Sequence, residues 1–418
     1  MIDIALLRDH PEDLEASLAR RGVTIDLVSL ASLDKERRSS RAEAEVVRSQ
    51  QKEIGKSIPG LDGTDKQAAI AEAGELASRY KDLLATADDL DEQFNAQWMT
   101  LPNMTDLSAA DGLEESDAVE IKRVGEPPQF GFDAVDHLDL GVALGVIDVE
   151  RAVKMSGSRF VLKKGRLALL EMALMRWAVA EVASHGFTPV IPPVLVREHA
   201  LYGTGFFPGD REQVYSVRED DLYLVGTSEV PLAAMHGDEI FDVDELPLRY
   251  VGMSTCFRVE AGTYGKDTRG MFRVHQFDKA EMFSFVHPDR SRDEHDYLLE
   301  REEEIIRALE IPYRVVNVAA GDLGSSASKK YDIEAWFPGQ GRYREVTSTS
   351  NTTDFQARRL KIRYKDEGKN ELVHTLNGTV VTPRHLIALM ENHQQADGSI
   401  RIPDVLVPYT GFDVIEAG

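Results

Sequence analysis

Two heptad runs joined by a short turn constrain this chain more than any other feature. From residue 27 to about 58, small and apolar side chains recur three and four positions apart: Leu30, Leu33, Ser40, Ala44, Val47, Ile54 and Ile58. After the turn sequence PGLDG at 59–63, the second run comprises Ala69, Ala73, Leu76, Tyr80, Leu83, Ala87, Leu90 and Phe94. This spacing predicts an antiparallel coiled-coil hairpin. At about 1.5 Å per residue each helix reaches roughly 40 to 50 Å, so we expect the hairpin to project into solvent.

Basic residues crowd the first helix of this predicted hairpin, whereas acidic residues dominate the second. The basic set is Lys35, Arg37, Arg38, Arg41, Arg48, Lys52 and Lys56. Such a set is typical of an ordinary solvated coiled-coil face, and it also suits a surface that follows the phosphates of an elongated RNA. The composition of the hairpin leaves both interpretations open.

The overall charge limits how any nucleic acid can bind. The chain has 418 residues, with 72 acidic against 48 basic side chains and a formal net charge of -24. A molecule this acidic repels a phosphate backbone, so nucleic-acid binding would require a local basic patch. The length favours two or three domains, and two is our expectation.

Cysteine usage and hydropathy indicate the cellular setting. Cys256 is the only cysteine, which excludes an intramolecular disulfide framework and any cysteine-rich zinc or iron–sulfur site. The N-terminal 22 residues are amphipathic and contain acidic residues, unlike a signal peptide. No run approaches the roughly 20 apolar residues of a membrane span. We therefore expect a cytoplasmic protein with no membrane contact and no zinc.

The remainder of the chain predicts an α+β domain. Residues 106–130 are acidic and proline-bearing, which is typical of a linker. Residues 166–185 have helical spacing, and strand-like runs such as YRVVNVAAG, YDIEAWF and YREVTSTS follow. Strands interrupted by few helices favour an antiparallel sheet with helices packed on it. No GxGxxG or GxxxxGK[ST] motif is present, so a nucleotide would bind without a phosphate-cradling glycine loop.

Opposed charges gather in the stretch CFRVEAGTYGKDTRGMFRVHQFDKAEMF at 256–283. On a strand, Arg258 and Glu260 would share one face, and so would Arg273, His275, Phe277, Lys279 and Glu281 on a partner strand. A hairpin of the two strands predicts a platform for a substrate with phosphates, a flat base and an ammonium group. Cross-strand ion pairs between solvent-facing strands would give the same pattern.

These residues, taken with others, resemble seryl-tRNA synthetase, a class II aminoacyl-tRNA synthetase of the bacterial type. The resemblance rests on LVGTSEVPL, FRVE, the TRG loop, FRVHQFDKAE, YREVTSTSNTTDFQARR and LNGTVVTPRHLIALMENHQQADGSIRIPDVLVPY, and it is strongest from Gly186 to Tyr409. It implies an antiparallel class II catalytic domain at 131–418, a linker at 106–130 and an N-terminal helical arm at 1–105 that grips serine tRNA. HGFTPVIPP, with Pro193, resembles the motif that forms the dimer interface, which implies a homodimer.

The resemblance assigns roles to individual residues. For serine it implies Thr227, Ser228, Glu229, Arg258, Glu281, Asn377 and Thr379. For ATP it implies Arg258, Val259, Glu260, Arg273, Val274, Phe277, Glu345, Val346, Thr347, Ser348 and Arg384. Glu345 and Ser348 would hold Mg²⁺ against the phosphates, and Arg258, Arg384 and Glu345 would be catalytic. For tRNA it implies Arg37, Arg38, Arg41, Arg48 and Lys52.

These assignments suit the chemistry that the resemblance implies. We choose Glu281 for the serine ammonium group and Arg258 for its carboxylate. Glu229 and Thr379 would bond the serine hydroxyl, and a site built around that hydroxyl rejects alanine. ATP activates serine to seryl-adenylate with release of diphosphate, by positioning and charge neutralisation and with no general base. Serine then passes to the 3′ end of tRNA(Ser), with tRNA(Sec) as a further candidate.

The sequence also differs from the commonest family pattern. Gly226 and Ser228 replace proline and alanine next to Thr227, and the run from Asn377 to Arg384 is one residue short. The alternative function is a catalytically altered paralogue that binds RNA or charges a carrier protein. Such a paralogue would lack a motif arginine, the magnesium carboxylate or the long hairpin, and this chain has all three.

Overall fold

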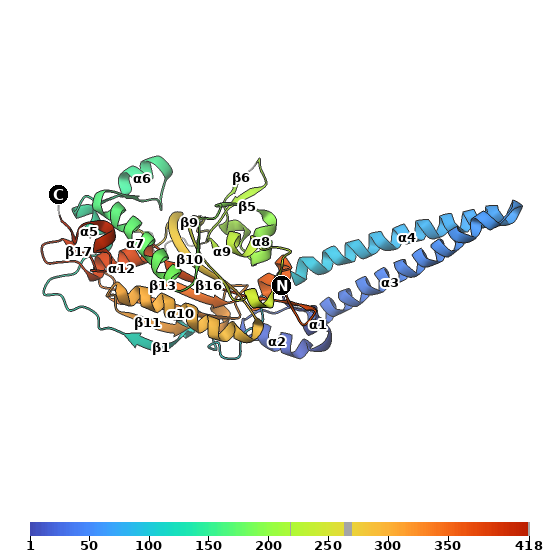
Figure 1. The fold of residues 1–418 in the computed structure, drawn as a ribbon, viewed down its shortest axis with the longest axis horizontal. Helices are drawn as coiled ribbons and strands as arrows, with labels where there is room; N and C mark the ends of the chain where they lie inside the picture. Colours follow the sequence, from blue (N-terminus) through green and yellow to red (C-terminus); the bar gives the residue numbers. More distant parts are fainter. Residues whose placement is uncertain (218, 263–269, 417–418) are drawn as a thin grey trace. The chain divides into compact units, whose positions relative to one another are not determined.

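A computed structural model of the protein describes residues 1–217, 219–262 and 270–416 (Figure 1). The chain divides into two compact units. One contains residues 3–19 and 23–101, and the other contains residues 1–2, 20–22 and the chain from 102 onward. Thr268 and Arg269 of the TRG loop lie outside the described residues.

The first unit is helical and contains the predicted hairpin. Its helices are α1 (Ile4–Asp9), α2 (Pro11–Arg20), α3 (Leu27–Ser57) and α4 (Gly63–Trp98), with a 3₁₀ turn at Ile58–Gly60. The two long helices lie side by side and run in opposite directions, which confirms the antiparallel coiled coil (Figure 1). The Asp26 side chain caps α3 by accepting a hydrogen bond from the backbone N–H of Ser29.

The seam between α3 and α4 is apolar over much of its length, but it also contains a buried carboxylate. Six of the expected seam residues are buried: Leu30, Ala44, Val47, Ala69, Ala87 and Phe94. Asp34 is buried among them with only 1 % of its surface exposed. The heptad pattern did not predict a carboxylate here.

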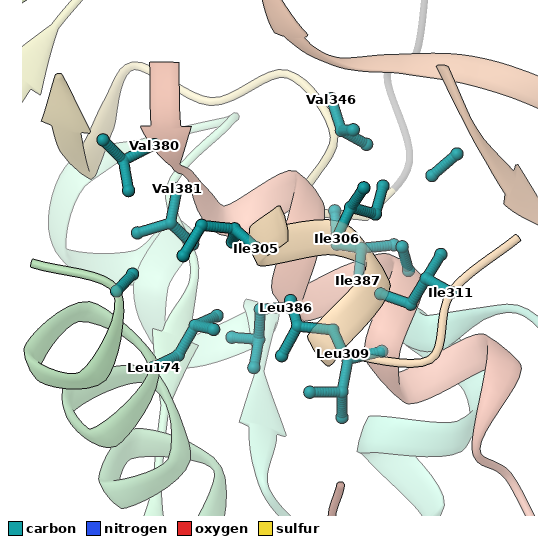
Figure 2. Packing of buried hydrophobic residues seen from close by; sticks show 14 of the residues in the cluster. Leu174, Ile305, Ile306, Leu309, Ile311, Val346, Val380, Val381, Leu386 and Ile387 are labelled. Carbon is teal, nitrogen blue, oxygen red and sulfur yellow. The ribbon is translucent and has the colours of Figure 1, made fainter. Parts of the chain in front are cut away.

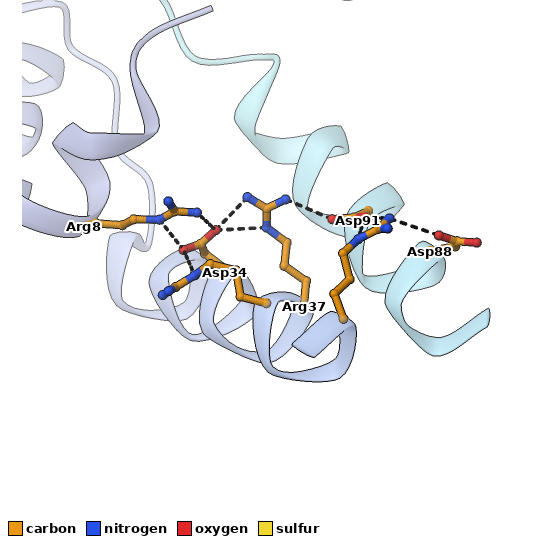
Figure 3. Close-up of polar contacts among 7 residues, drawn as sticks. Arg8, Asp34, Arg37, Asp88 and Asp91 are labelled. Atoms are coloured by element: carbon orange, nitrogen blue, oxygen red, sulfur yellow. Dashed lines mark hydrogen bonds and ion pairs between the residues drawn. The ribbon is translucent and has the colours of Figure 1, made fainter. Parts of the chain in front are cut away.

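Arginines surround the buried Asp34 carboxylate (Figure 3). It accepts hydrogen bonds from Arg8 Nε at 2.8 Å, Arg37 Nη2 at 2.7 Å and Arg38 Nε at 3.0 Å. Arg37 also bonds Asp91 on α4 at 2.9 Å, which links the two helices. Burial alone would raise the pKa of Asp34, but the arginine hydrogen bonds outweigh it and lower that pKa to about 2. The network therefore replaces apolar packing at this end of the hairpin.

The second unit is built on an eight-stranded sheet with the order β1-β11-β12-β13-β16-β10-β9-β4. Every neighbouring pair is antiparallel except β4 and β9. The strands are β1 (Val119–Val124), β4 (Thr188–Val190), β9 (Leu248–Phe257), β10 (Gln276–Val286), β11 (Tyr313–Asn317), β12 (Lys329–Phe337), β13 (Arg342–Asn351) and β16 (His374–Val381). The predicted α+β class with an antiparallel sheet is confirmed. β1 comes from the segment predicted as a linker, since residues 119–124 pair with β11 at the edge of the sheet.

Helices and small sheets complete the unit. The helices are α5 (His137–Ala143), α6 (Val149–Ser156), α7 (Gly165–Ser184), α8 (Glu198–Thr204), α9 (Glu229–Ala234), α10 (Ser291–Ala308), α11 (Phe355–Leu360), α12 (Pro383–Asn392) and α13 (Val407–Thr410). The remaining strands are β2 (Ile147–Asp148), β3 (Leu162–Lys163), β5 (Leu195–Arg197), β6 (Ser216–Val217), β7 (Leu222–Leu224), β8 (Ile240–Asp242), β14 (Arg363–Asp366), β15 (Lys369–Leu372), β17 (Ile400–Arg401) and β18 (Val414–Ile415). None of the described helices is both long enough and apolar enough to cross a membrane.

The main core lies where α7, α10 and α12 pack on the sheet (Figure 2). Leu174 of α7, Ile305 of α10 and Leu386 of α12 meet the β16 side chains Val380 and Val381 there, and all five are buried. Burying a leucine or isoleucine side chain stabilises the fold by about 1.5–3 kcal/mol. This packing holds β16 and the start of α12 in place, and both carry predicted site residues.

Candidate active site

A cavity of about 400 Å³ lies in the second unit and collects most of the residues predicted for serine and ATP. Its volume is within the usual range for small-molecule sites. The predicted residues that line it are Thr227, Glu229, Arg258, Glu260, Arg273, Val274, Phe277, Glu281, Glu345, Val346, Ser348, Asn377, Thr379 and Arg384. They come from β10, β13, β16, α9 and α12 and from the segments between elements.

Glu281 lies on the central strand β10 and points into the cavity. Thr379 of β16 stands directly opposite in the register and donates its hydroxyl to Glu281 Oε2 at 3.2 Å. Lys279 Nζ is 2.6 Å from the same oxygen. Side chains two positions apart on a strand share a face, so Phe277, Lys279 and Glu281 all line the cavity as predicted.

Glu229, the first residue of α9, is a second carboxyl in this part of the cavity. It is 8 % exposed and accepts a hydrogen bond from Gln356 Nε2 at 2.7 Å. Burial, and next the negative charge of Glu281, raise the pKa of Glu229 to about 7. Lys279 and Arg258 oppose that rise. The cavity thus holds Glu281, which lies beside a cation, and Glu229, whose pKa is raised, and this pair suits an ammonium group and a hydroxyl.

Arg258 follows β9 directly and lines the same cavity as both carboxyls. Its Nε donates to the Gly226 carbonyl at 3.2 Å, and its guanidinium lies over the ring of Phe277 at 5.3 Å. The backbone N–H of Arg258 bonds the His275 carbonyl, and His275 Nδ1 lies 3.0 Å from the Arg258 carbonyl oxygen. A cation in this position can neutralise a carboxylate or a phosphate.

Glu260 has a backbone conformation that few non-glycine residues adopt, with φ at +55°. Gln213 holds both sides of it, because its carbonyl accepts from Val259 and its side chain bonds Ala261. The Glu260 carboxylate then pairs with Arg273 at 2.7 Å. Strained backbone of this kind is common at ligand sites. β9 ends at Phe257 and β10 begins at Gln276, so Arg258, Glu260 and Arg273 lie just beyond the paired strands and not within them.

Glu345 and Arg384 face each other in another part of the cavity. Arg384, in the first turn of α12, approaches the Glu345 carboxylate at 3.2 Å and the Glu345 carbonyl at 3.1 Å. Burial would raise the pKa of Glu345, but the cations Arg384, Lys330 and Arg258 lower it to about 2. The residue is therefore a carboxylate at neutral pH.

A β-bulge explains how adjacent residues of β13 reach the cavity together. The pairing with β12 skips Val346, since Ile333 pairs with Thr347 and Glu334 with Glu345. Glu345, Val346 and Ser348 therefore all line the cavity. The Ser348 hydroxyl donates to Glu345 Oε1 at 3.3 Å. One carboxylate and one hydroxyl, with phosphates, fit the oxygen ligands that Mg²⁺ takes.

Three predicted residues do not line the cavity. Ser228 is fully buried and donates to the Gly252 carbonyl at 3.1 Å. Val259 contributes its backbone N–H to the Gln213 carbonyl. Thr347 faces α10, where its hydroxyl donates to Glu302 at 2.8 Å. Strand alternation explains why Thr347 points away from the cavity, because its neighbours Val346 and Ser348 face it.

Other cavity residues received no role from the sequence. Phe272 lies beneath the Arg384 guanidinium at 4.7 Å, and Arg344 also approaches that ring at 3.9 Å. Lys330 pairs with the buried Asp332 at 3.3 Å, and burial together with Glu345 raises the pKa of Asp332 to about 7. Alternation along β12 places Lys330 and Asp332 on one face, so the sequence pattern could have predicted that these two side chains lie together.

The residues predicted for tRNA lie on α3, and most have partners within the hairpin. Arg37 is committed to Asp34 and Asp91, and Arg41 contacts Asp88 and Asp91 (Figure 3). The remaining three are Arg38, which bonds Asp34; Arg48, which lies over Tyr80 at 4.9 Å and bonds Gln51; and Lys52, which is exposed. Arg41 is 51 % exposed, and exposed ion pairs are worth only about 0–1 kcal/mol. Arg41 can therefore exchange its carboxylates for phosphate more readily than Arg37.

Comparisons with known proteins agree with this geometry. Residues 1–105 match the family model for the seryl-tRNA synthetase N-terminal domain, and residues 213–393 match the tRNA synthetase class II core domain (G, H, P, S and T). Serine--tRNA ligase from Acidothermus cellulolyticus is 52% identical over 417 residues, and that from Thermobifida fusca is 49% identical over 417 residues. Each match covers 99% of both chains.

A solved structure gives the same result for the whole chain. The crystal structure of seryl-tRNA synthetase from Pyrococcus horikoshii complexed with ATP is 40% identical, with a TM-score of 0.93 and full coverage of both chains. Two family models, near-complete matches at about half identity and a shared structure all point the same way. The chain belongs to the serine--tRNA ligase family, a family of class II aminoacyl-tRNA synthetases.

Proposed function

We propose that this cavity joins serine to AMP and then to tRNA. The observation that carries the proposal is that one cavity contains Glu281, Arg258, Glu345 and Arg384. A carboxylate for an ammonium group and cations for a carboxylate and phosphates are what an amino acid and ATP require. The Pyrococcus horikoshii relative was crystallised in complex with ATP, which supports ATP as the nucleotide.

In the first step the serine carboxylate oxygen attacks the α-phosphorus of ATP, and diphosphate leaves. Arg258 would hold the attacking carboxylate and the α-phosphate, while Arg384 would neutralise charge on the departing phosphates. Glu345 and Ser348 would hold Mg²⁺, which when bound supplies further neutralisation of phosphate charge. In the second step a ribose hydroxyl of the terminal adenosine of tRNA attacks the acyl carbon, and AMP leaves.

Selectivity for serine would come from Glu229 and Thr379. A site with buried hydrogen-bonding groups rejects an analogue that leaves those groups without partners. Exchange of labelled diphosphate into ATP tests the function. We expect exchange with serine and ATP in the presence of Mg²⁺, and very little with alanine. Absence of exchange with serine would contradict the proposal and favour an RNA-binding paralogue.

We also propose that the enzyme charges tRNA(Ser) in the cytoplasm through the basic face of α3, with tRNA(Sec) to be tested in the same aminoacylation assay. The match of residues 1–105 to the seryl-tRNA synthetase N-terminal domain supports this role for the arm. The basic side chains on α3 supply a local positive surface on an acidic protein, as the phosphate backbone requires.

A homodimer is a further part of the proposal. Residues 185–193 resemble the dimer motif, and β4 within them is a terminal strand of the large sheet. Ile191 is 87 % exposed, and Met172 of α7, the helix packed against β4, is 69 % exposed. A homodimer built on this edge would bury these two apolar side chains. Light scattering of the purified protein measures the oligomeric state, and Ile191→Glu is expected to shift it toward the monomer.

A further inference from the structure

Strands β13 and β16 separate as they approach the active-site cavity. They pair at Thr349 with Gly378, Ser350 with Asn377 and Asn351 with Leu376, and the described pairing ends there. Beyond that point β13 continues to Ser348 and Glu345, on the side proposed for phosphate and metal. β16 continues to Thr379, on the side proposed for serine. Among the described residues, no pair between β13 and β16 fixes the spacing of the two strand segments beyond Thr349 and Gly378.

Glu302 of α10 lies at this separation. It is fully buried, and its Oε2 accepts the hydroxyl of Thr347 at 2.8 Å. The backbone N–H of Thr379 also lies close enough to this carboxyl to lower its pKa. A Cβ on Gly378 would come within 3.0 Å of Glu302 Oε1. One side chain therefore contacts both strands just where their own pairing stops.

The position of Glu302 differs from that of a cavity residue. It does not line the cavity, whereas Thr379, which it contacts through the backbone, does. Thr379 in turn bonds Glu281, and Thr347 lies next to Ser348 in the chain. Glu302 therefore contacts neither proposed substrate site directly, and it reaches both sites only through the neighbouring residues Thr379 and Thr347.

The surroundings of Glu302 favour a neutral carboxylic acid. Burial, with further contributions from Glu281 and Asp332, raises its pKa well above the ordinary value, although the hydrogen bond from Thr347 and the backbone N–H of Thr379 oppose the rise. Oε1 has no hydrogen-bond partner among the described residues. An oxygen without a partner costs less free energy in a neutral acid than in a buried carboxylate.

We propose that Glu302 is a positioning residue for serine activation. Inserted between β13 and β16, it fixes Thr379 against Glu281 and keeps Ser348 and Glu345 in register with that pair, without contacting serine or ATP. The inference rests on the proposed function, because the reaction that it serves is serine activation. A merely structural role would require only a side chain of the same size.

Three variants of the full-length enzyme separate these roles. Glu302→Gln keeps the size and a hydrogen-bonding carbonyl, Glu302→Met keeps the size alone, and Glu303→Met is the matched control. Glu303 is the next residue of α10, is also buried, and bonds Tyr313 at 2.7 Å, a residue that does not line the cavity. The measurements are serine-dependent diphosphate exchange, with KM for serine and for ATP, and thermal melting.

We expect Glu302→Gln to stay within about three-fold of the wild type, since only the hydroxyl of a neutral acid is lost. We expect Glu302→Met to raise KM for serine by about ten-fold or more, because the hydrogen bond from Thr347 and the polar contact with the Thr379 backbone are both lost. We expect Glu303→Met to change melting with little change in KM. An unchanged KM for serine in Glu302→Met would overturn the inference, as would equal impairment of the Gln and Met variants.

A second variant keeps the inference testable where Glu302→Met does not fold. Thr347→Val removes the hydroxyl that holds Glu302, and we expect KM for serine to rise about five-fold, the effect of one hydrogen bond. An unchanged KM in Thr347→Val would then contradict the inference. A wild-type enzyme without serine-dependent exchange would instead contradict the proposed function.

Discussion

At the residue scale, two carboxyls of the cavity have different partners although both are buried. Glu281 is paired with Lys279 at 2.6 Å, whereas Glu229 accepts its hydrogen bond from the neutral amide of Gln356. This difference explains why burial raises the pKa of Glu229 to about 7. It also separates the proposed roles, because an ammonium group needs a charged partner and a hydroxyl needs only an acceptor.

The Glu229 pKa predicts a pH dependence for serine binding. Below about pH 7 Glu229 is protonated and is a poorer acceptor for the serine hydroxyl, and above it the carboxylate forms. We therefore expect KM for serine in diphosphate exchange to fall as the pH rises from about 6 to about 8. Glu229→Gln, which cannot ionise, should have a higher and nearly flat KM over that range. The same pH dependence in both proteins would contradict the role of Glu229.

Glu281 has a sharper predicted phenotype. Glu281→Gln keeps the shape and the acceptor for Thr379 but removes the charge that would pair with the serine ammonium group. A charge-assisted hydrogen bond is worth about 1.5–3 kcal/mol, so we expect KM for serine to rise by about 10- to 150-fold. KM for ATP should change little. A selective rise in KM for ATP would instead place Glu281 with the nucleotide.

The sequence predicted the charged residues of the cavity but not their supports. Arg258, Glu345 and Arg384 stand in short motifs that resemble the family, so their positions were found without coordinates. Phe272 lies within the FRVHQFDKAE stretch but received no role, and Lys330 and Glu302 lie outside the motifs that carry the resemblance. Glu302 belongs to a helix whose pattern is amphipathic, and only the packing of α10 beneath β13 and β16 brings it to Thr347.

At the element scale, bulges and helix ends place the side chains. The skipped Val346 turns Glu345 toward the cavity, and a second irregularity in the pairing of β10 with β16 aligns Glu281 with Thr379. The shortened run from Asn377 to Arg384 is strand β16 through Val381, followed by Thr382 as the cap of α12. Alternation along a strand predicts faces, but it does not predict where a bulge shifts them.

In the hairpin, the heptad pattern likewise predicts the helices but not every buried residue. The first helix of the hairpin was predicted at 27 to about 58 and spans Leu27–Ser57, but the buried Asp34 was not predicted, because a carboxylate breaks the apolar pattern. Partners from three separate positions, Arg8, Arg37 and Arg38, make its burial tolerable. Such a partner set is visible only in three dimensions.

Asp34→Asn tests the contribution of this network to the arm. Breaking a buried ion pair by removing one partner typically costs about 3–5 kcal/mol, because the remaining charges lose their partner. We expect faster hydrogen exchange in the α3 and α4 amides of the full-length protein, measured by mass spectrometry. Asp88→Asn is the matched control, since the Asp88 side chain is 70 % exposed, and we expect little change.

The pH dependence of the network has a definite sign. The pKa of Asp34 is lowered from 3.8 to about 2, so its stabilising contribution is complete above about pH 4 and is lost as the pH falls through about 2. The difference in exchange between the wild type and Asp34→Asn should therefore shrink at low pH. A difference that grows on acidification would contradict this account.

At the scale of the whole molecule, an acidic protein is proposed to bind an acidic substrate. The net charge of -24 makes the average field repulsive, so binding of tRNA would depend on the basic residues of α3. The cavity residues proposed for activation belong to the unit that contains the chain from residue 102 onward, whereas α3 belongs to the other unit. The two activities should therefore respond separately to charge changes on the arm.

A triple charge reversal on α3 tests this separation. The arm variant carries Arg41→Glu, Arg48→Glu and Lys52→Glu. Each lost phosphate contact weakens RNA binding and flattens its dependence on salt. We expect KM for tRNA in aminoacylation to rise by at least about ten-fold and its increase with salt concentration to become less steep. Diphosphate exchange with serine and ATP should stay near the wild-type rate.

A matched control distinguishes local contacts from total charge. The control variant carries the same change of net charge on exposed lysines of the other unit: Lys154→Glu, Lys365→Glu and Lys369→Glu. If the basic face of α3 contacts the tRNA, only the arm variant loses the steep salt dependence. Equal effects of the two variants on KM for tRNA would show that overall repulsion governs binding. Loss of diphosphate exchange in the arm variant would instead indicate misfolding, which melting curves of the two variants detect.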